Sequence, residues 1–365
     1  MATAKKAIHF PLIDNGDSKS SNAKGTFSGL HPLKELIQRI TEIYGPSGHE
    51  QAVRDLIRDE IKGWVDEIRV DALGNLIARK KGAGTAPRKK VMLAAHMDEI
   101  GVIVTHVDEK GFLRFAPIGG VHPVNLTGSR CRFANGVTGV FGRETKNTTA
   151  TEVKLDKMFI DVGATSANDS PVGVGDAAGF WRDYCDLGDR IVSKALDDRI
   201  GCVVLIETLK QLKKSTDDVY FVFTVQEEVG LRGATTSAFG VQPDLAIAVD
   251  VTGTGDTPEA TRMAVELGKG PAIKVKDSGM LAHPAVKNLL AEAAKEAKIP
   301  YQFEVLVGGT TDAMAMQTTR EGVPAGCISI PTRYIHSPSE MVDFNDVQNA
   351  VKLLVTVLGK AIKLD

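Results

Sequence analysis

The chain is poor in cysteine and has no long apolar run. Its four cysteines are scattered and no Cys-x-x-Cys pair occurs, so neither a zinc–thiolate site nor a disulfide framework is expected. No apolar stretch approaches the roughly 20 residues that span a bilayer. Residues 1–29 lack the continuous apolar core of a signal peptide. These absences predict a cytoplasmic protein with reduced thiols and no membrane partner.

A charge excess and phosphate-binding motifs are also missing. Lysine and arginine number 44 against 46 aspartates and glutamates, so the net charge of −2 gives no global field that attracts nucleic acid. Neither GxxxxGK[ST] nor a strand-linked GxGxxG is present. We therefore expect no nucleic-acid partner. With 365 residues, 43% of them apolar, the chain can form one large and one smaller folded unit.

The spacing of apolar residues indicates an α/β unit interrupted by a β-rich one. A helical period over residues 33–44 and the continuously apolar strand Val91–Ala95 favour a sheet with both faces covered. Between about residues 100 and 180, short alternating strands replace the helical pattern. We predict a flexible N-terminal extension at 1–29, a catalytic unit at 30–98 and 186–365, and an inserted β-rich unit at 99–185.

Two histidines and three acidic residues each lie beside a short apolar run. In chain order these candidate metal ligands are His96, Asp197, Glu228, Asp250 and His336. Open α/β sheets build their sites where the strands reach their carboxyl ends. Two imidazoles and three carboxylates, with further carboxylates beside them, form the ligand set of a two-metal hydrolase. The sequence therefore predicts a dinuclear metal centre.

His96 has an acidic neighbour at a spacing that suits indirect support of a metal. Residues two apart in an extended segment point the same way, so Asp98 can hold the far ring nitrogen of His96 and fix its tautomer. The alternative is a surface histidine beside an acid. That alternative is less favoured because His96 and Asp98 directly follow a strand that is expected to be buried.

Asp197 allows two interpretations. It can cap the helix that follows, which is the more common role for an isolated Asp-Asp-Arg. It can also bridge two metal ions, since two dications a few ångströms apart need an anion between them. In that case Asp198 and Arg199 would lie behind the bridging carboxylate.

Glu227 and Glu228 end the most apolar strand of the chain, and Gly230 follows closely. Adjacent residues of a regular strand face opposite ways, so one glutamate could simply face solvent. At a bent strand end both can enter one cleft, as a metal ligand and a general acid–base group. Asp250 closes a buried strand, where an unpaired carboxylate is costly. Its expected partner is a metal ion or, alternatively, an arginine or lysine across the cleft.

The other histidines carry less information. His336 lies on a loop whose mobility Pro338 limits. His122, in the inserted unit, could reach a neighbouring site, although we expect a structural role for it. We expect the remaining histidines to be structural or surface residues.

At these residues the chain resembles the M42 family of metallo-aminopeptidases, the glutamyl, leucyl and lysyl enzymes that include the tetrahedral (TET) particles. The resemblance runs from about Leu33 to Leu364. It rests on the segments Ala95–Gly101, Ala195–Arg199, Gln226–Ala234, Asp250–Thr252, Gly309–Ala313 and Ile335–Ser337, in this order.

The resemblance implies two co-catalytic ions, Zn²⁺ or Co²⁺. The implied ligands are His96 and Asp250 for one ion, Glu228 and His336 for the other, and Asp197 as the bridge. Asp98 would orient His96, and Glu227 would be the general base. A cis peptide bond is implied after Asp197.

The resemblance also implies a fold and partners. The fold is a mixed central sheet flanked by helices, with an inserted PDZ-like β-barrel that drives dimerisation. Peptides with a free N-terminus would be the substrates, and the chains would form a homo-oligomer, a dodecamer built from dimers. Lys274 and Lys276 could favour acidic first residues, but lysines on a strand face are more often solvated, so this preference stays open.

Other functions fit parts of the pattern. A metal-dependent amidohydrolase or deacylase on the same scaffold would keep the ligands and prefer N-acyl substrates. An endoglucanase needs two carboxylates across a glycosidic bond and would have no use for the two histidines. A non-catalytic assembly protein would be expected to lose Glu227, which is present.

Overall fold

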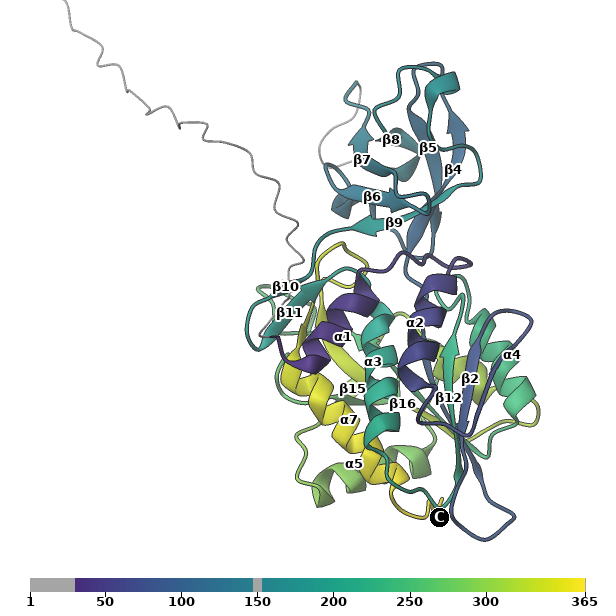
Figure 1. Cartoon of the computed structure of the whole chain (residues 1–365). Coiled ribbons are helices and arrows are strands. Elements are labelled where there is room, and N and C mark those ends of the chain that lie inside the picture. The colour runs from purple at the N-terminus through teal and green to yellow at the C-terminus, as the bar shows by residue number, and fades with distance from the viewer. Residues whose placement is uncertain (1–29, 147–152, 365) are drawn as a thin grey trace, which may run out of the picture.

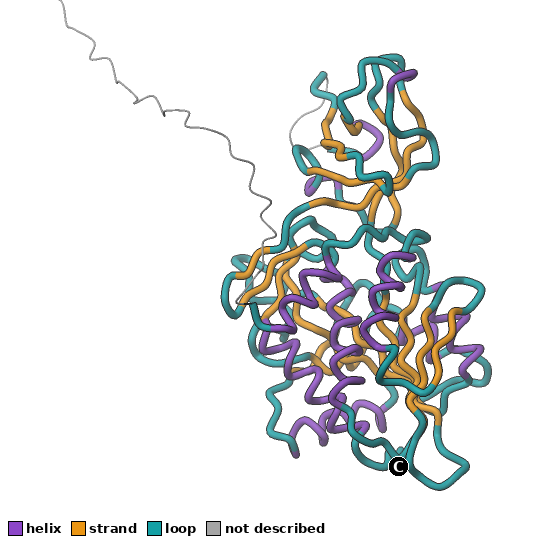
Figure 2. Tube along the Cα trace, in the orientation of Figure 1, coloured by secondary structure: helices purple, strands orange, loops and turns teal. Residues whose placement is uncertain are grey.

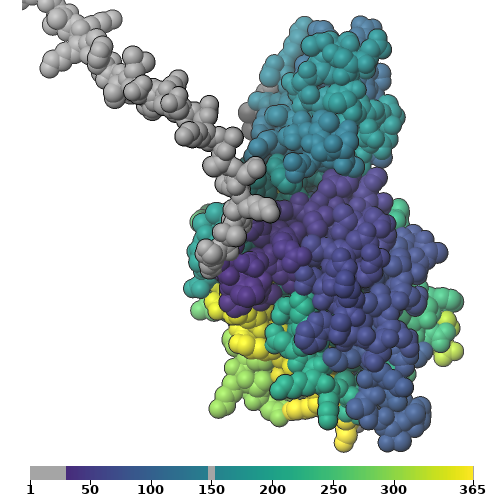
Figure 3. Space-filling view, in the orientation of Figure 1, coloured from purple at the N-terminus to yellow at the C-terminus, as the bar shows by residue number. Residues whose placement is uncertain are grey.

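The computed structural model describes residues 30–146 and 153–364. The predicted extension at 1–29 lies outside the described residues. Figure 1 shows a large α/β body from which a small β-barrel projects, and the space-filling view in Figure 3 shows the barrel standing on one end of that body. The predicted fold class, a mixed sheet flanked by helices with an inserted small barrel, is confirmed.

An 11-stranded mixed sheet forms the centre of the large body. Its strands are β1 (Glu67–Val70), β2 (Leu76–Lys80), β3 (Lys90–His96), β10 (Cys185–Asp186), β11 (Arg190–Ser193), β12 (Asp218–Thr224), β13 (Leu245–Thr252), β14 (Ala272–Lys276), β15 (Gln302–Val305), β16 (Ala325–Arg333) and β17 (Glu340–Asp343). The main order is β1-β2-β12-β3-β13-β16-β17-β11-β10, and β14 joins β15 to β16.

Helices cover both faces of this sheet, as Figure 2 shows. The helices are α1 (Pro32–Thr41), α2 (Gln51–Ile61), α3 (Leu196–Gln211), α4 (Arg232–Val241), α5 (Pro284–Glu296), α6 (Asp312–Gln317) and α7 (Phe344–Leu358). The larger apolar core joins one sheet face to α1, α2, α3, α5 and α7. A smaller core joins the other face to α4 and α6. The doubly covered strands β3, β12 and β13 are therefore apolar over most of their length, as the sequence predicts.

The neighbouring strands β12, β3, β13 and β16 are all parallel. Parallel strands bring their carboxyl ends to the same edge of a sheet. β3 ends at His96, β12 ends shortly before Glu227, Asp250 lies near the end of β13, and β16 ends shortly before His336. This topology gathers residues from distant parts of the chain at one place.

Six strands close the barrel, in the order β4-β5-β8-β7-β6-β9. They are β4 (Gly101–Val107), β5 (Leu113–Ile118), β6 (Arg130–Phe133), β7 (Thr138–Arg143), β8 (Met158–Asp161) and β9 (Ala177–Trp181). The barrel has its own apolar core. Its strands fall inside the stretch 99–185, but the domain boundaries themselves remain a prediction. Among the described helices, none combines the length and apolarity that a membrane crossing requires.

Candidate metal centre

A cavity of about 470 Å³ opens at the carboxyl edge of the parallel strands. The predicted ligands and the predicted base all line it: His96, Asp197, Glu227, Glu228, Asp250 and His336. Asp98 lies behind the wall and is fully buried. The structure thus brings together every residue that the sequence singled out for the metal centre.

Asp197 lies between the two imidazoles. One of its oxygens, Oδ1, is 3.1 Å from Nε2 of His96, and the other, Oδ2, is 3.4 Å from Nε2 of His336. Glu228 Oε1 lies 3.3 Å from the same nitrogen of His336, and Glu227 Oε2 lies 3.8 Å from Nε2 of His96. A single carboxylate therefore faces two separate nitrogen donors, each with a second carboxylate beside it.

The donor atoms fit metal ions in two adjoining groups. Ligand atoms of His96, Glu227 and Asp250 lie within 4.8 Å of one another, as do those of His96, Asp197 and Glu228. Nitrogen and carboxylate oxygen are donors that Zn²⁺ accepts at about 2 Å, so such separations leave room for an ion. Glu228 Oε1 is buried, and its nearest nitrogen, Nε2 of His336 at 3.3 Å, does not lie in the geometry of a hydrogen bond to it. A cation would satisfy that oxygen.

The charges in the cavity are unbalanced. Burial raises the pKa of Glu227 and of Asp250 well above the ordinary range, and carboxylate neighbours add to this while His96 opposes it. Burial alone would lower the pKa of His96, but Glu227, Asp197 and Asp98 outweigh that effect and raise it. Burial would likewise raise the pKa of Asp197, yet the two imidazoles lower it. Carboxylates outnumber cationic groups here, so a divalent ion is the partner that would keep them ionised.

Asp98 supports the centre from behind. The Nδ1 atom of His96 lies 3.0 Å from the backbone oxygen of Asp98 and 3.4 Å from its carboxylate. A proton on Nδ1 leaves Nε2 free to bind a metal. The Asp98 carboxylate accepts hydrogen bonds from the backbone N–H groups of Glu227 and Glu228, at 3.0 and 3.2 Å, and from the Ser47 hydroxyl at 2.6 Å. It therefore orders both glutamates as well as the histidine.

Asp197 and Asp198 divide the two roles that the sequence left open. Both have non-helical backbone angles, and the peptide bond between them is cis, as the resemblance implies. Asp198 Oδ1 accepts a hydrogen bond from the backbone of Gly201 at 3.1 Å, and Oδ2 accepts one from His96 N at 3.2 Å. Asp198 therefore caps the helix, and Asp197 is free to face the cavity.

Glu340 also contacts two of the candidate ligands, although the sequence pattern did not point to it. Its Oε2 accepts a hydrogen bond from the backbone of Asp197, and its Oε1 accepts one from the backbone of His336, both at 2.9 Å. Burial and the nearby Asp197 raise its pKa to about 8. Only its position soon after His336 in the sequence could have suggested this role.

The comparisons with known proteins agree with this geometry. The family model described as M42 glutamyl aminopeptidase matches residues 74–353. This chain belongs to the M42 family of aminopeptidases. It is therefore a peptide hydrolase of a metal-dependent family.

Similar proteins cover nearly the whole M42 chain. A putative aminopeptidase of Acetivibrio thermocellus is 53% identical over 326 residues, which span 89% of this chain and 98% of the relative. The structure of aminopeptidase APDkam598 from Desulfurococcus kamchatkensis has a TM-score of 0.86 and 45% identity, with 90% of this chain and 95% of that chain covered. The Pyrococcus horikoshii TET1 peptidase, which can assemble into a tetrahedron or a large octahedral shell, has a TM-score of 0.80 and 34% identity, with 89% and 99% covered.

The wall of the M42 cavity also contains a buried lysine. Lys274 lines the cavity, but its amine lies 2.7 Å from Glu304 Oε1 and 3.7 Å from Asp277 Oδ2. Lys276 is exposed and is not among the lining residues. The expectation of solvated lysines therefore holds for Lys276 but is wrong for Lys274, whose charge is matched by carboxylates inside the fold. This matching weakens the case for an acidic first residue.

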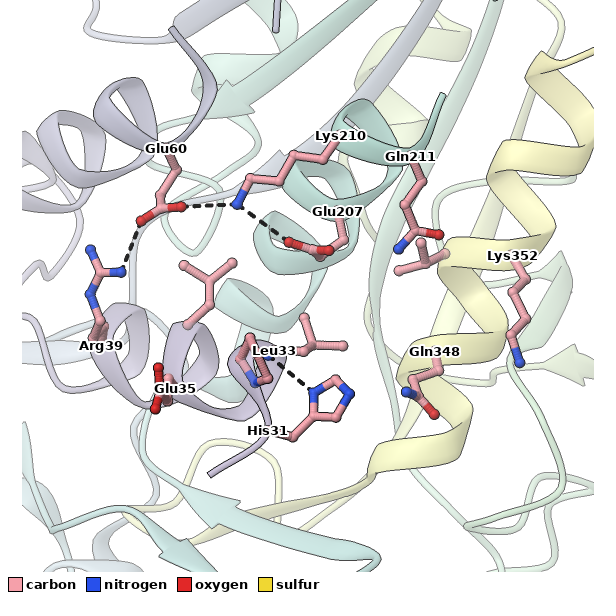
Figure 4. A pocket seen from close by; sticks show the side chains of 13 residues that line it. His31, Leu33, Glu35, Arg39, Glu60, Glu207, Lys210, Gln211, Gln348 and Lys352 are labelled. Carbon is pink, nitrogen blue, oxygen red and sulfur yellow. Dashed lines mark hydrogen bonds and ion pairs between the residues drawn. The ribbon is translucent and has the colours of Figure 1, made fainter. Parts of the chain in front are cut away.

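A second cavity of this M42 chain, about 490 Å³, lies on the helical side (Figure 4). α1, α3 and α7 supply most of its lining. Four of its charged groups form ion pairs along the series Arg39, Glu60, Lys210 and Glu207. Among the described residues, no group of histidine, cysteine or carboxylate ligand atoms in this cavity is close enough together to hold a metal ion.

Proposed function

We propose that this chain is a two-metal aminopeptidase that removes N-terminal residues from peptides. The observation that carries the proposal is the place of Asp197, whose two carboxylate oxygens face the imidazoles of two different histidines. An anion in that position suits two neighbouring cations better than one.

We assign the ligands in two sets that share Asp197. His96 and Asp250 would hold one ion, Zn²⁺ or Co²⁺, and Glu228 and His336 would hold the other. Support for the first set comes from the close approach of His96 and Asp250. Support for the second set comes from the 3.3 Å separation of His336 Nε2 and Glu228 Oε1.

Glu227 is the proposed general base. When bound, the ions would supply a water of lowered pKa and polarise the scissile carbonyl. Glu227 reaches the cavity from the loop after β12 and lies 3.8 Å from His96 Nε2, where it can accept the proton of the attacking water. The same carboxyl group can then return the proton to the leaving amine. Asp98 holds the backbone of Glu227 in place for both transfers.

The adjacent glutamates provide a matched pair of variants. We expect Glu227→Gln to bind two ions and to lose about 10²- to 10⁴-fold in kcat, since it removes a proton acceptor. Glu228→Gln should lose affinity for one ion. Metal titration and hydrolysis of aminoacyl-p-nitroanilides measure the two effects. Two-ion binding by Glu227→Gln with undiminished kcat would overturn the assignment of the base.

The same assay separates the proposal from its closest alternative. Aminopeptidase activity should vanish with EDTA, return with Zn²⁺ or Co²⁺, and fail on N-acetylated substrates. Cleavage of the acetylated compounds alone would instead identify a deacylase on this scaffold.

We also propose a dimer-based dodecamer in the cytoplasm. Support for the assembly comes from the likeness to the TET1 peptidase, which can assemble into a tetrahedron or a large octahedral shell. Light scattering of the metal-loaded protein measures the particle mass, and a monomer at assay concentration would contradict the assembly.

A further inference from the structure

The inserted barrel supplies part of the wall of the metal centre. After β5, the chain turns at Gly119 and Gly120, and Gly120 lines the same cavity as the proposed ligands. The short 3₁₀ helix Pro123–Asn125 follows directly. A segment of the inserted unit thus lies against His336, far along the chain in the large body.

Gly120 makes room for the imidazole of His336. A β-carbon added at Gly120 would lie 2.6 Å from Nδ1 and 2.7 Å from Cε1 of that ring, well inside contact distance. The three nearest atoms to that added carbon all belong to His336. The backbone of Gly120 is outside the positive-φ region, so an alanine there would strain nothing but this contact.

Gly119 does the same for the other residue of the proposed ligand set. A β-carbon at Gly119 would lie 2.8 Å from Cγ2 of Ile100, and 3.1 Å from Cβ and 3.2 Å from Oε2 of Glu228. The φ angle of +76° at Gly119 also favours glycine for the backbone itself. The two glycines therefore face Glu228 and His336 in turn.

The loop of His336 is held from both sides. Asn125 Nδ2 donates a hydrogen bond to the backbone oxygen of His336 at 3.3 Å, and the backbone N–H of His336 donates to Glu340 at 2.9 Å. His336 has a φ of +59°, a conformation that residues other than glycine rarely adopt. Such a conformation persists only where its surroundings fix it, and Asn125 is one of the groups that do so.

We propose that Gly120 and Asn125 of the inserted barrel are positioning residues for the metal ion held by Glu228 and His336. The inference rests on the proposed two-metal function. Gly120 sets the space in which the imidazole lies, and Asn125 fixes the backbone that carries it. The contacts of Gly120 and Asn125 described above are with His336, not with His96 or Asp250.

Gly120→Ala and Asn125→Ala test the proposal through metal binding rather than activity. Titration of the metal-free protein with Zn²⁺ should show two ions for the wild type. In each variant one of them should bind about 10- to 100-fold more weakly, as is typical when a ligand loses its outer support. The other ion should bind as in the wild type. Asn125→Asp, which keeps the shape and loses the donor, should resemble Asn125→Ala.

Two substitutions in the same barrel serve as controls. A β-carbon at Gly173 would meet no described atom within 4 Å, so Gly173→Ala is the matched control for Gly120→Ala. Val124 is 81% exposed beside Asn125, so Val124→Ala is the control for Asn125→Ala. Both controls should bind two ions with wild-type affinity.

The outcomes are distinct. Gly120→Ala and Asn125→Ala that bind both ions as tightly as the wild type would overturn the proposal. Equal weakening of both ions, with a lower unfolding temperature of the chelated protein, would also overturn it, since that is a general structural defect. A wild type that binds fewer than two ions would instead contradict the proposed function on which the inference rests.

Discussion

Asp98 and Glu99 are neighbours in the chain but belong to two different buried clusters of charged residues. The two clusters differ in how far their positive and negative charges balance. Glu99 forms ion pairs with Lys194 at 2.6 Å and with Arg199 at 3.1 Å. The guanidinium of Arg199 also donates to backbone oxygens, including those of Met97 and Ile40 at 3.1 Å. Its sequence position beside Asp198 suggests the metal centre, yet Arg199 belongs to this second network.

The candidate metal centre has the opposite balance. Its carboxylates outnumber its imidazoles, and the buried Oε1 of Glu228 makes no hydrogen bond of good geometry with the described residues, although His336 Nε2 lies 3.3 Å away. Burial of charge therefore does not by itself mark a reactive site. A buried excess of negative charge does mark such a site, because a bound cation is needed to neutralise it. The comparison predicts that neutralising a carboxylate has opposite effects on stability in the two clusters.

The largest effect is expected in the matched network. Glu99→Gln leaves Lys194 and Arg199 buried without their counter-charge, which should lower the free energy of unfolding by about 3–5 kcal/mol. Urea unfolding of the metal-free protein, in the presence of EDTA, measures this change. The exposed pair of Lys360 and Glu296 offers a control, since Glu296→Gln should cost at most about 1 kcal/mol. Equal losses in the two variants would remove the distinction between the networks.

A change of the opposite sign is expected at the metal centre. Asp250 has a pKa well above its ordinary range, chiefly because of burial, so its charged form destabilises the metal-free fold at neutral pH. Asp250→Asn should therefore raise the free energy of unfolding of the chelated protein by about 1–2 kcal/mol. The same variant should gain less stability than the wild type when Zn²⁺ is added. Unfolding of both proteins with EDTA and with Zn²⁺ tests this, and a destabilised chelated variant would contradict it.

A smaller, pH-dependent effect is expected from Lys194. Burial lowers its pKa to about 8 from an ordinary value of 10.5, with Glu99 opposing the change and Arg199 adding to it. Below pH 8 the lysine is charged in both the folded and unfolded chain, so folding bears the full cost of burying the charge. Between about pH 8 and 10.5 the unfolded chain binds more protons, so this cost fades and stability rises.

The comparison with Lys194→Met isolates this contribution. From pH 8 to pH 9, the wild type should gain about 1 kcal/mol of unfolding free energy relative to the variant. Urea titrations at the two pH values provide the measurement. Parallel pH profiles of the two proteins would show that Lys194 does not titrate in this range.

The sequence predicts which residues gather at this edge of the sheet, because several of them directly follow apolar runs. Continuous apolar runs mark β3, β12 and β13, and parallel topology then brings His96, Glu228 and Asp250 to one edge. The roles of Asp197 and Asp198 could not be separated in this way, since both precede a helix and only the backbone turn between them decides which one caps it.

Contacts between distant segments were beyond the reach of sequence patterns. Asn125 binds the backbone of His336, and Glu340 binds the backbone of Asp197. No sequence motif marks a side chain that binds a distant carbonyl or N–H group. Lys274 lies in a strand that pairs on both sides, which buries a residue that composition alone would place in solvent. In each case the deciding partner lies in another strand or loop.

The place of Gly120 has a consequence for how such enzymes can be recombined. Because this glycine belongs to the barrel while the ring it faces belongs to the large body, the wall of the cavity is encoded in two separate stretches of the chain. A shortened enzyme made by deleting the barrel would lose a side of its own reaction chamber. Grafting a barrel from a relative would succeed only if that barrel carried a glycine at the position of Gly120.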